Sequence, residues 1–140
     1  MTENADCEVL AFIRFASRLR IKNTGQLLKE DIPPAFAYVL ANELRTNRQI
    51  AKRCGIYLNR LCTKPYLTHS DAQKGRLDVG LPKPNVRTAA ELLIISATAE
   101  VIGITRRLSA GKGCSERVMA FCEKVVESES DFIDRIRSFL

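Results

Sequence analysis

The side chains with catalytic potential are few, and they gather in one irregular segment. His69, the one histidine of the chain, is followed by Ser70 and Asp71, so a base, a hydroxyl and a carboxylate stand together. Adjacent residues rarely point toward one another, and neither a nucleophile turn nor a glycine-rich phosphate loop accompanies them. Ser70 and Asp71 are better explained as turn residues that bond to the local backbone. We therefore expect a protein that is not an enzyme and has no cofactor.

The five cysteines have spacings that do not suit a metal site. Cys54 and Cys62 are eight residues apart, as are Cys114 and Cys122, and Cys7 stands alone. Zinc sites use closer pairs, and disulfide frameworks use even numbers of cysteines. We expect all five to be small buried thiols on helix faces, with no metal bound.

Positive charge is concentrated in the middle third of the chain. The whole chain has 22 basic and 16 acidic side chains, a formal charge of +6. Residues 44–87 have ten basic and two acidic side chains, whereas residues 1–43 and 88–140 each carry a charge of −1. Such a segment is typical of polyanion binding, and the alternative is an ordinary solvated surface.

Within this basic segment, residues 46–64 have the pattern of two short helices joined by a tight turn. Ala51 is small enough for a close helix crossing, and Gly55 suits the turn between the helices. The segment resembles the helix-turn-helix of DNA-binding proteins, although Leu58, Lys64 and Pro65 depart from the usual pattern. The alternative is a basic pair of helices that packs into the core.

The resemblance implies a role for particular residues. Its second helix would lie in the major groove and bring three side chains near base edges: Tyr57, Asn59 and Arg60. The remaining candidates would approach phosphates: Arg45, Thr46, Asn47, Arg48, Lys52, Arg53 and Lys64. A second mode is open, because Tyr57 and Tyr66 alternate with Arg60 and Lys64, as in proteins that stack single-stranded bases.

The elements that position these residues are helices. Apolar periodicity predicts a first helix over residues 7–21, broken at Asn23–Gln26, with room for a short helix over 26–30. A further helix is predicted to start at Asp31–Pro34, with Asp31 as the N-cap and proline in the first turn, and to run to about Arg45. Others are predicted from a capping box at Thr46 to Gly55, and over 56–63. Residues 63–87 are irregular and rich in Pro and Gly. A mostly apolar helix follows from Thr88, and a last helix runs from Ser115, with a kink expected near Glu129.

These features together predict an all-α fold in a single domain, residues 1–140. We expect five to six helices in a compact bundle that ends in a long antiparallel helical hairpin. The domain divides into a helix-turn-helix-like part (1–62), a basic Pro/Gly loop (63–87) and a hairpin (88–140) that forms the core or a homodimer contact.

The composition, 46% hydrophobic and 27% charged, is that of a globular protein. No signal peptide is recognisable, and the apolar stretch Leu92–Ile104 is too short to span a bilayer and contains Glu100. We therefore expect a cytoplasmic, DNA-binding regulatory or accessory protein that does not bind membranes, with DNA favoured over RNA. The alternative is a helical protein–protein interaction module, an adaptor, inhibitor or assembly factor that uses its C-terminal helices.

Overall fold

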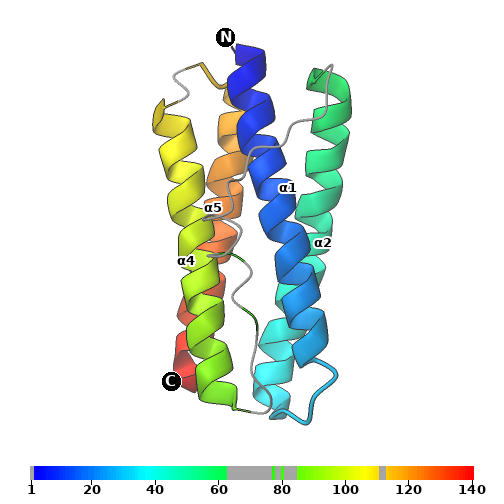
Figure 1. The fold of residues 1–140 in the computed structure, drawn as a ribbon, viewed down its shortest axis with the longest axis vertical. Coiled ribbons are helices and arrows are strands. Elements are labelled where there is room, and N and C mark those ends of the chain that lie inside the picture. Colours follow the sequence, from blue (N-terminus) through cyan, green and yellow to red (C-terminus); the bar gives the residue numbers. More distant parts are fainter. Residues whose placement is uncertain (1, 63–76, 78–79, 81–84, 111–112) are drawn as a thin grey trace.

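The computed structural model describes residues 2–62, 77, 80, 85–110 and 113–140. These ranges form four α-helices, α1 (Thr2–Leu27), α2 (Pro34–Leu61), α4 (Val86–Ala110) and α5 (Glu116–Ile136), and a short 3-10 helix, η1 (Arg137–Phe139). The helices stand side by side in one bundle (Figure 1). The predicted all-α class is confirmed, but the predicted count of five to six helices is wrong for the described part of the chain.

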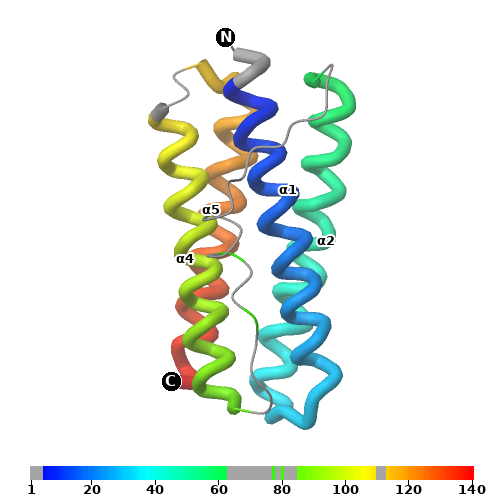
Figure 2. The backbone as a smooth tube through the Cα atoms, viewed as in Figure 1, coloured from blue at the N-terminus to red at the C-terminus, as the bar shows by residue number. Residues whose placement is uncertain are grey.

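The order of the helices around the bundle is set by their contacts. α1 packs against α2 and α4, and α5 packs against α4 and α2, so α2 and α4 occupy diagonal corners. The backbone tube shows α1 and α5 running downward and α2 and α4 running upward (Figure 2). The C-terminal helices α4 and α5 are therefore antiparallel neighbours, as predicted.

The first helix is longer than its sequence pattern suggests. α1 passes through the expected break at Asn23–Gln26 without interruption. The Thr24 hydroxyl donates a hydrogen bond to the Arg20 carbonyl over 2.7 Å, and Asn23 and Thr24 are both buried. Polar residues that signal a turn in isolation are here held inside the bundle, where packing outweighs local preference.

The second helix joins three predicted helices into one. α2 continues through Thr46 and through Gly55, so the predicted cap and the predicted turn at these positions are wrong. An interior glycine costs a helix about 1 kcal/mol relative to alanine. The buried stripe formed by Ile50, Cys54 and Leu58 continues without a break across Gly55. Burial of this stripe offsets the cost, and the helix continues without interruption through the basic segment up to Leu61.

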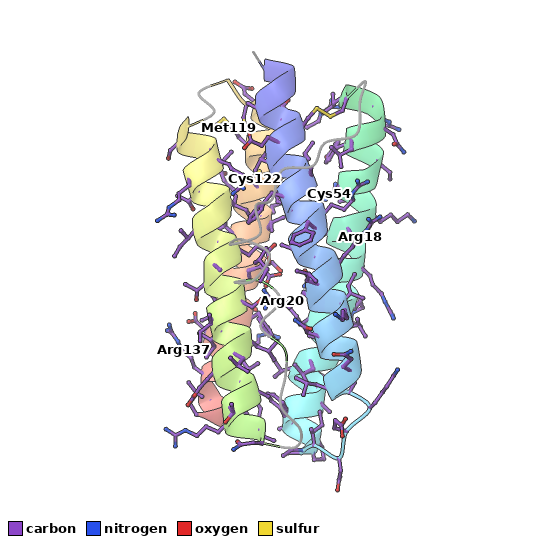
Figure 3. The ribbon with its side chains drawn as sticks, in the orientation of Figure 1. Arg18, Arg20, Cys54, Met119, Cys122 and Arg137 are labelled. Atoms are coloured by element: carbon purple, nitrogen blue, oxygen red, sulfur yellow. A yellow bond between two sulfur atoms is a disulfide. The ribbon has the colours of Figure 1, made fainter. Side chains whose placement is uncertain are left out.

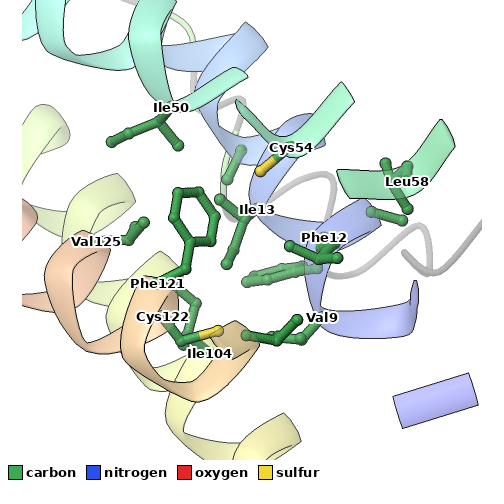
Figure 4. Close-up of a cluster of buried hydrophobic side chains, with 14 of the residues drawn as sticks. Val9, Phe12, Ile13, Ile50, Cys54, Leu58, Ile104, Phe121, Cys122 and Val125 are labelled. Carbon is green, nitrogen blue, oxygen red and sulfur yellow. The ribbon is translucent and has the colours of Figure 1, made fainter. Parts of the chain in front are cut away.

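Two apolar clusters fill the bundle. In the cluster near the N-terminus, Phe12 and Ile13 of α1 pack with Cys54 of α2 and with Phe121 and Cys122 of α5 (Figure 4). The cluster at the other end of the bundle is formed mainly by Phe36, Leu40, Leu93, Phe132 and Ile136.

Four of the buried charged side chains lie together in the interior of the bundle, one from each helix. Arg20 of α1 is 1% exposed and lies in the middle of the bundle (Figure 3). Its Nη2 is 3.5 Å from Glu100 Oε1 of α4, and its Nε is 3.9 Å from Glu43 Oε2 of α2. Arg20 also donates to the Leu93 carbonyl over 3.2 Å. Glu129 of α5, fully buried, completes the set, and its carboxylate acts on the pKa of Arg20.

These four side chains form the buried charge cluster, and its acids do not behave as exposed acids do. Burial raises the pKa of Glu43 and of Glu100 well above the usual range, and the neighbouring Glu129 raises both further. Arg20 opposes the rise, but one guanidinium cannot balance three carboxylates. Burial alone would lower the pKa of Arg20, and the three acids reverse this effect.

A disulfide closes the α1–α2 hairpin. Cys7 and Cys62 are bonded, with their Cα atoms 6.1 Å apart, so the prediction that both are free thiols is wrong. Cys54, Cys114 and Cys122 are free, and burial raises the pKa of Cys122 to about 12. Among the described residues, no three His, Cys, Asp or Glu side chains are arranged to hold a metal ion.

The apolar part of α4 is longer than the stretch Leu92–Ile104, which was predicted to be too short to span a bilayer. Residues Val86–Ser109 are long and apolar enough to cross a membrane by length and composition alone. In the bundle this helix buries Ser96 and Glu100, and Glu100 pairs with Arg20. Both of these polar side chains therefore face the interior of the bundle.

Removing the disulfide is expected to lower stability. The bridge closes a loop with a sequence separation of 55 residues. For a loop of this size, the chain-entropy estimate is about 4 kcal/mol of stabilisation. We expect Cys7→Ser/Cys62→Ser to lower the free energy of unfolding by about 2–4 kcal/mol in urea titrations. Dithiothreitol should destabilise the wild type and leave this variant unchanged, and an equal effect of reductant on both would contradict the bridge.

The buried charge cluster predicts that stability falls as the pH rises. In the unfolded chain Glu43 and Glu100 ionise near the ordinary glutamate pKa, whereas in the folded chain they keep their protons to higher pH. The folded state therefore binds more protons, and the stabilisation present at low pH is lost as the pH rises through the folded pKa values. Urea midpoints measured from pH 5 to pH 9 should fall for the wild type.

Glutamine variants at buried and exposed positions separate the effect of the buried acids from that of the protein's net charge. Glu100→Gln and Glu43→Gln should each make the pH dependence shallower, because glutamine does not ionise. Glu127→Gln, which alters an exposed acid, should keep the wild-type slope. A wild-type midpoint that rises with pH would show that the buried acids are ionised in the folded protein.

Candidate nucleic-acid interface

The exposed face of α2 carries a row of cations. Arg45, Arg48 and Lys52 are three and four residues apart, and Arg53 and Arg60 are seven apart, so two short sets of cations lie beside each other on the outward side of the helix. All five are exposed: Arg45, Arg48, Lys52, Arg53 and Arg60. These five residues are called the basic row below. From Arg45 to Arg60 the row extends about 22 Å at the rise of an α-helix.

Acidic side chains do not neutralise the basic row. The one acid of α2 is Glu43, which is buried in the charge cluster on the opposite side of the helix. None of the ion pairs between described residues includes a cation of the row, and Arg45 instead donates to the Asn42 side chain over 2.8 Å. By contrast, the exposed arginines 87, 135 and 137 each pair with a nearby acid.

The neighbouring helix α1 adds to the positive potential. Arg14 lies near enough to Cys54 of α2 to oppose the rise in the pKa of that thiol. Arg18 and Lys22 follow at intervals of four residues, and both are exposed. Between Val9 and Lys29, α1 and the turn after it contain no acidic residue. The outer surface of the α1–α2 hairpin is therefore positive over most of its length.

A shallow groove runs between α2 and α5 beside the basic row. Its cavity volume is about 180 Å³, and it is lined by Thr46, Gln49, Ile50, Arg53, Phe121, Lys124, Val125 and Ser128. The Arg53 guanidinium lies 6.0 Å from the centre of the Phe121 ring. Arg53 and the exposed Lys124 place two cations at this groove, one from each helix.

The predicted contact residues fall into four groups. Six are exposed on α2 as expected: Arg45, Arg48, Lys52, Arg53, Asn59 and Arg60. Thr46 and Tyr57 are half-buried, and the Tyr57 ring packs edge-on against Phe121 with 5.4 Å between ring centres. Lys64 and Tyr66 lie outside the described residues, as do His69, Ser70 and Asp71. Asn47 is fully buried, so it is not part of the surface, contrary to the prediction.

The burial of Asn47 has a clear cause. Its amide nitrogen donates to Glu129 Oε1 over 3.2 Å and to the Glu43 carbonyl over 3.0 Å. Asn47 therefore belongs to the buried charge cluster and connects α2 to α5. Sequence reasoning missed Arg14, Arg18 and Lys22 as candidate contacts, although their four-residue spacing and the lack of nearby acids were visible.

Because α2 is one continuous helix, its exposed face suits some ligands better than others. Its cations project from the side of a helix that lies in the bundle wall, and within the described part of residues 46–64 there is one helix instead of two. Arginine and lysine in such a row suit phosphate oxygens, which carry no sequence information. The described residues of this face include no acid or histidine that could serve as a general base.

Comparisons with known proteins do not change this description. The chain matches no protein-family model, no curated protein and no solved structure.

Substitutions at the adjacent residues Asn47 and Arg48 should differ in their effect on stability, because the first is buried and the second is exposed. Asn47→Ala removes two buried hydrogen bonds, so we expect the free energy of unfolding to fall by about 2 kcal/mol. Arg48→Gln alters an exposed side chain and should change it by less than about 0.5 kcal/mol. Urea denaturation followed by circular dichroism measures both. Equal effects of the two substitutions would contradict the rotation of α2 in the bundle.

Proposed function

We propose that this protein binds nucleic acid, with duplex DNA as the main ligand, through the basic row of α2. The observation that supports the proposal most is a line of five exposed cations on one helix face with no acid among them. Arg14 and Arg18 of α1 and Lys124 of α5 extend the positive surface on both sides of the row. Such a concentration of one sign of charge attracts a polyanion along its length.

The proposed binding depends on phosphates rather than on base edges. A row of about 22 Å corresponds to about six base-pair steps of 3.4 Å along a strand. Arginine side chains reach phosphates from a flat helix face, whereas reading bases requires an element that enters a groove. We therefore infer a low dependence on sequence, as suits an accessory protein. Asn59 is the exposed amide best placed to contribute any base preference.

A protein-binding role is the second candidate, and exposed apolar residues of the C-terminal helices favour it. Ile95 and Ile102 of α4, Met119 of α5 and the C-terminal Leu140 are each more than 40% exposed. An adaptor or inhibitor would use such residues to bind its partner. Substitutions in the basic row should leave that binding unchanged, which distinguishes the two roles.

The cytoplasmic location expected from the sequence stays a prediction. Disulfides persist mainly in oxidising compartments, and cytosolic ones are usually transient. The redox state of Cys7 and Cys62 in cells is therefore the observation that would bear on location.

The proposal is tested by the salt dependence of binding. A labelled duplex of about 20 base pairs and a single strand of equal length are titrated by fluorescence anisotropy at several salt concentrations. Removing four phosphate contacts should make the slope of log K against log salt shallower by about 3.6. We expect this from Arg48→Gln/Lys52→Gln/Arg53→Gln/Arg60→Gln, with weaker binding to every sequence.

A matched variant controls for net charge. Arg87→Gln/Arg117→Gln/Arg135→Gln/Arg137→Gln removes the same charge from α4, α5 and η1, and it should nearly keep the wild-type slope. Equal losses in the two variants would assign binding to net charge instead of the basic row. Absence of binding by the wild type at low salt would overturn the proposal and favour the protein-binding role.

A further inference from the structure

The outer face of α4 bears an apolar stripe with opposite charges at its ends. Ile95 is 52% exposed and Ile102 is 45% exposed, two turns apart on the same face. Ala99 lies between them, half-buried. Glu91 and Arg106, both exposed, stand at the two ends of the stripe. These side chains face away from the core, where the same helix buries Leu93, Ala97, Glu100 and Ile104.

The two isoleucines and the two end charges are placed symmetrically about one midpoint of the stripe. The midpoint between Ile95 and Ile102 falls between Thr98 and Ala99, and the midpoint between Glu91 and Arg106 is the same. If a second α4 lies antiparallel across this midpoint, each Ile95 meets the other copy's Ile102. Each Glu91 then meets the other copy's Arg106. A face that is complementary to itself in this way is what a two-fold symmetric interface requires.

The surface beside the stripe is hollowed and can receive side chains. A cavity of about 330 Å³ lies along the stripe, lined by Phe12, Ile94, Ile95, Thr98, Ala99, Ile102, Gly103 and Arg106. A Cβ at Gly103 would collide with the Phe12 ring, so the glycine allows this ring to form the floor of the hollow. An isoleucine from a facing helix would be buried against apolar atoms there.

Glu91 and Arg106 can each also form an ion pair with a residue of a second molecule. Glu91 receives a hydrogen bond from Arg87 over 3.3 Å, and Arg87 is largely exposed. A carboxylate has acceptor sites for a second cation beside the first. No ion pair between described residues includes Arg106.

We propose that two copies of this chain form an antiparallel dimer through the outer face of α4. Ile95 and Ile102 form the apolar centre of the contact, and two Glu91–Arg106 pairs set its direction and register. The proposal is independent of nucleic-acid binding, because the basic row lies on α2 at the diagonal corner of the bundle.

The charge pairs allow a test by reversal and restoration. Sedimentation velocity over a concentration series measures the dimer Kd of the full chain. Glu91→Arg or Arg106→Glu alone places like charges opposite each other and should raise that Kd about tenfold or more. The double variant Glu91→Arg/Arg106→Glu restores opposite charges and should return the Kd toward the wild-type value. Glu127→Arg, a reversal on α5, should leave it unchanged.

Cysteine cross-linking tests the direction of the helices. Thr98 lies at the proposed two-fold axis, so Thr98→Cys should give a disulfide-linked dimer under mild oxidation. Ile95→Cys should not, since in an antiparallel pair its counterpart is Ile102. Wild-type protein, with the buried thiols Cys54 and Cys122 and the half-buried thiol Cys114, controls for the native cysteines.

Each contrary outcome overturns the proposal. A wild-type monomer at all concentrations would show that the face is free or binds a different partner. Cross-linking through Ile95→Cys in place of Thr98→Cys would indicate parallel helices. Failure of the double charge variant to recover would show that Glu91 and Arg106 do not meet.

Discussion

The guanidinium of Arg20 is the point on which the bundle depends. It lies at the centre of four helices and is surrounded by carboxyl groups from the other three. Burying a charge is costly unless it is paired and hydrogen-bonded, so a rotation or shift of one helix that separated Arg20 from these carboxyl groups would be strongly unfavourable. Apolar side chains alone would still pack if one helix slid along the bundle by a turn, whereas the buried charge cluster would lose its ion pairs. We infer that it sets the register of the bundle more than it adds net stability.

The helices were largely predictable from the sequence, but their ends were not. The apolar spacing correctly indicated helices in residues 7–21, between about 34 and 61, after Thr88 and after Ser115. The last helix was predicted to start near Ser115, and the Ser115 side chain indeed accepts from the Val118 backbone amide. Thr24, Thr46 and Gly55 were taken as breaks because each favours a cap or turn in a short peptide. Their helical state depends on partners from other helices, which local sequence does not reveal. The Cys7–Cys62 bond likewise joins residues far apart in sequence.

The candidate interface was partly predictable for the same reason. The positive charge of residues 44–60 was visible by counting, and most of its cations are indeed on the surface. The burial of Asn47 was not visible, because its partner Glu129 is 82 residues away. The role of Arg20 was hidden as well, since a helical pattern placed it on the polar side of α1. In both cases the deciding contact is between helices that lie far apart along the chain.

The diagonal placement of α2 and α4 has a geometric consequence for any assembly that uses both helices. Their outer faces point in opposite directions, so two copies joined through α4 present their two α2 faces at the far ends of the pair. Such a particle is bivalent, and a single straight duplex cannot occupy both ends at once. If the basic row binds DNA, the pair would hold two separate duplex segments, or the two arms of one looped molecule, at a spacing fixed by the width of two bundles.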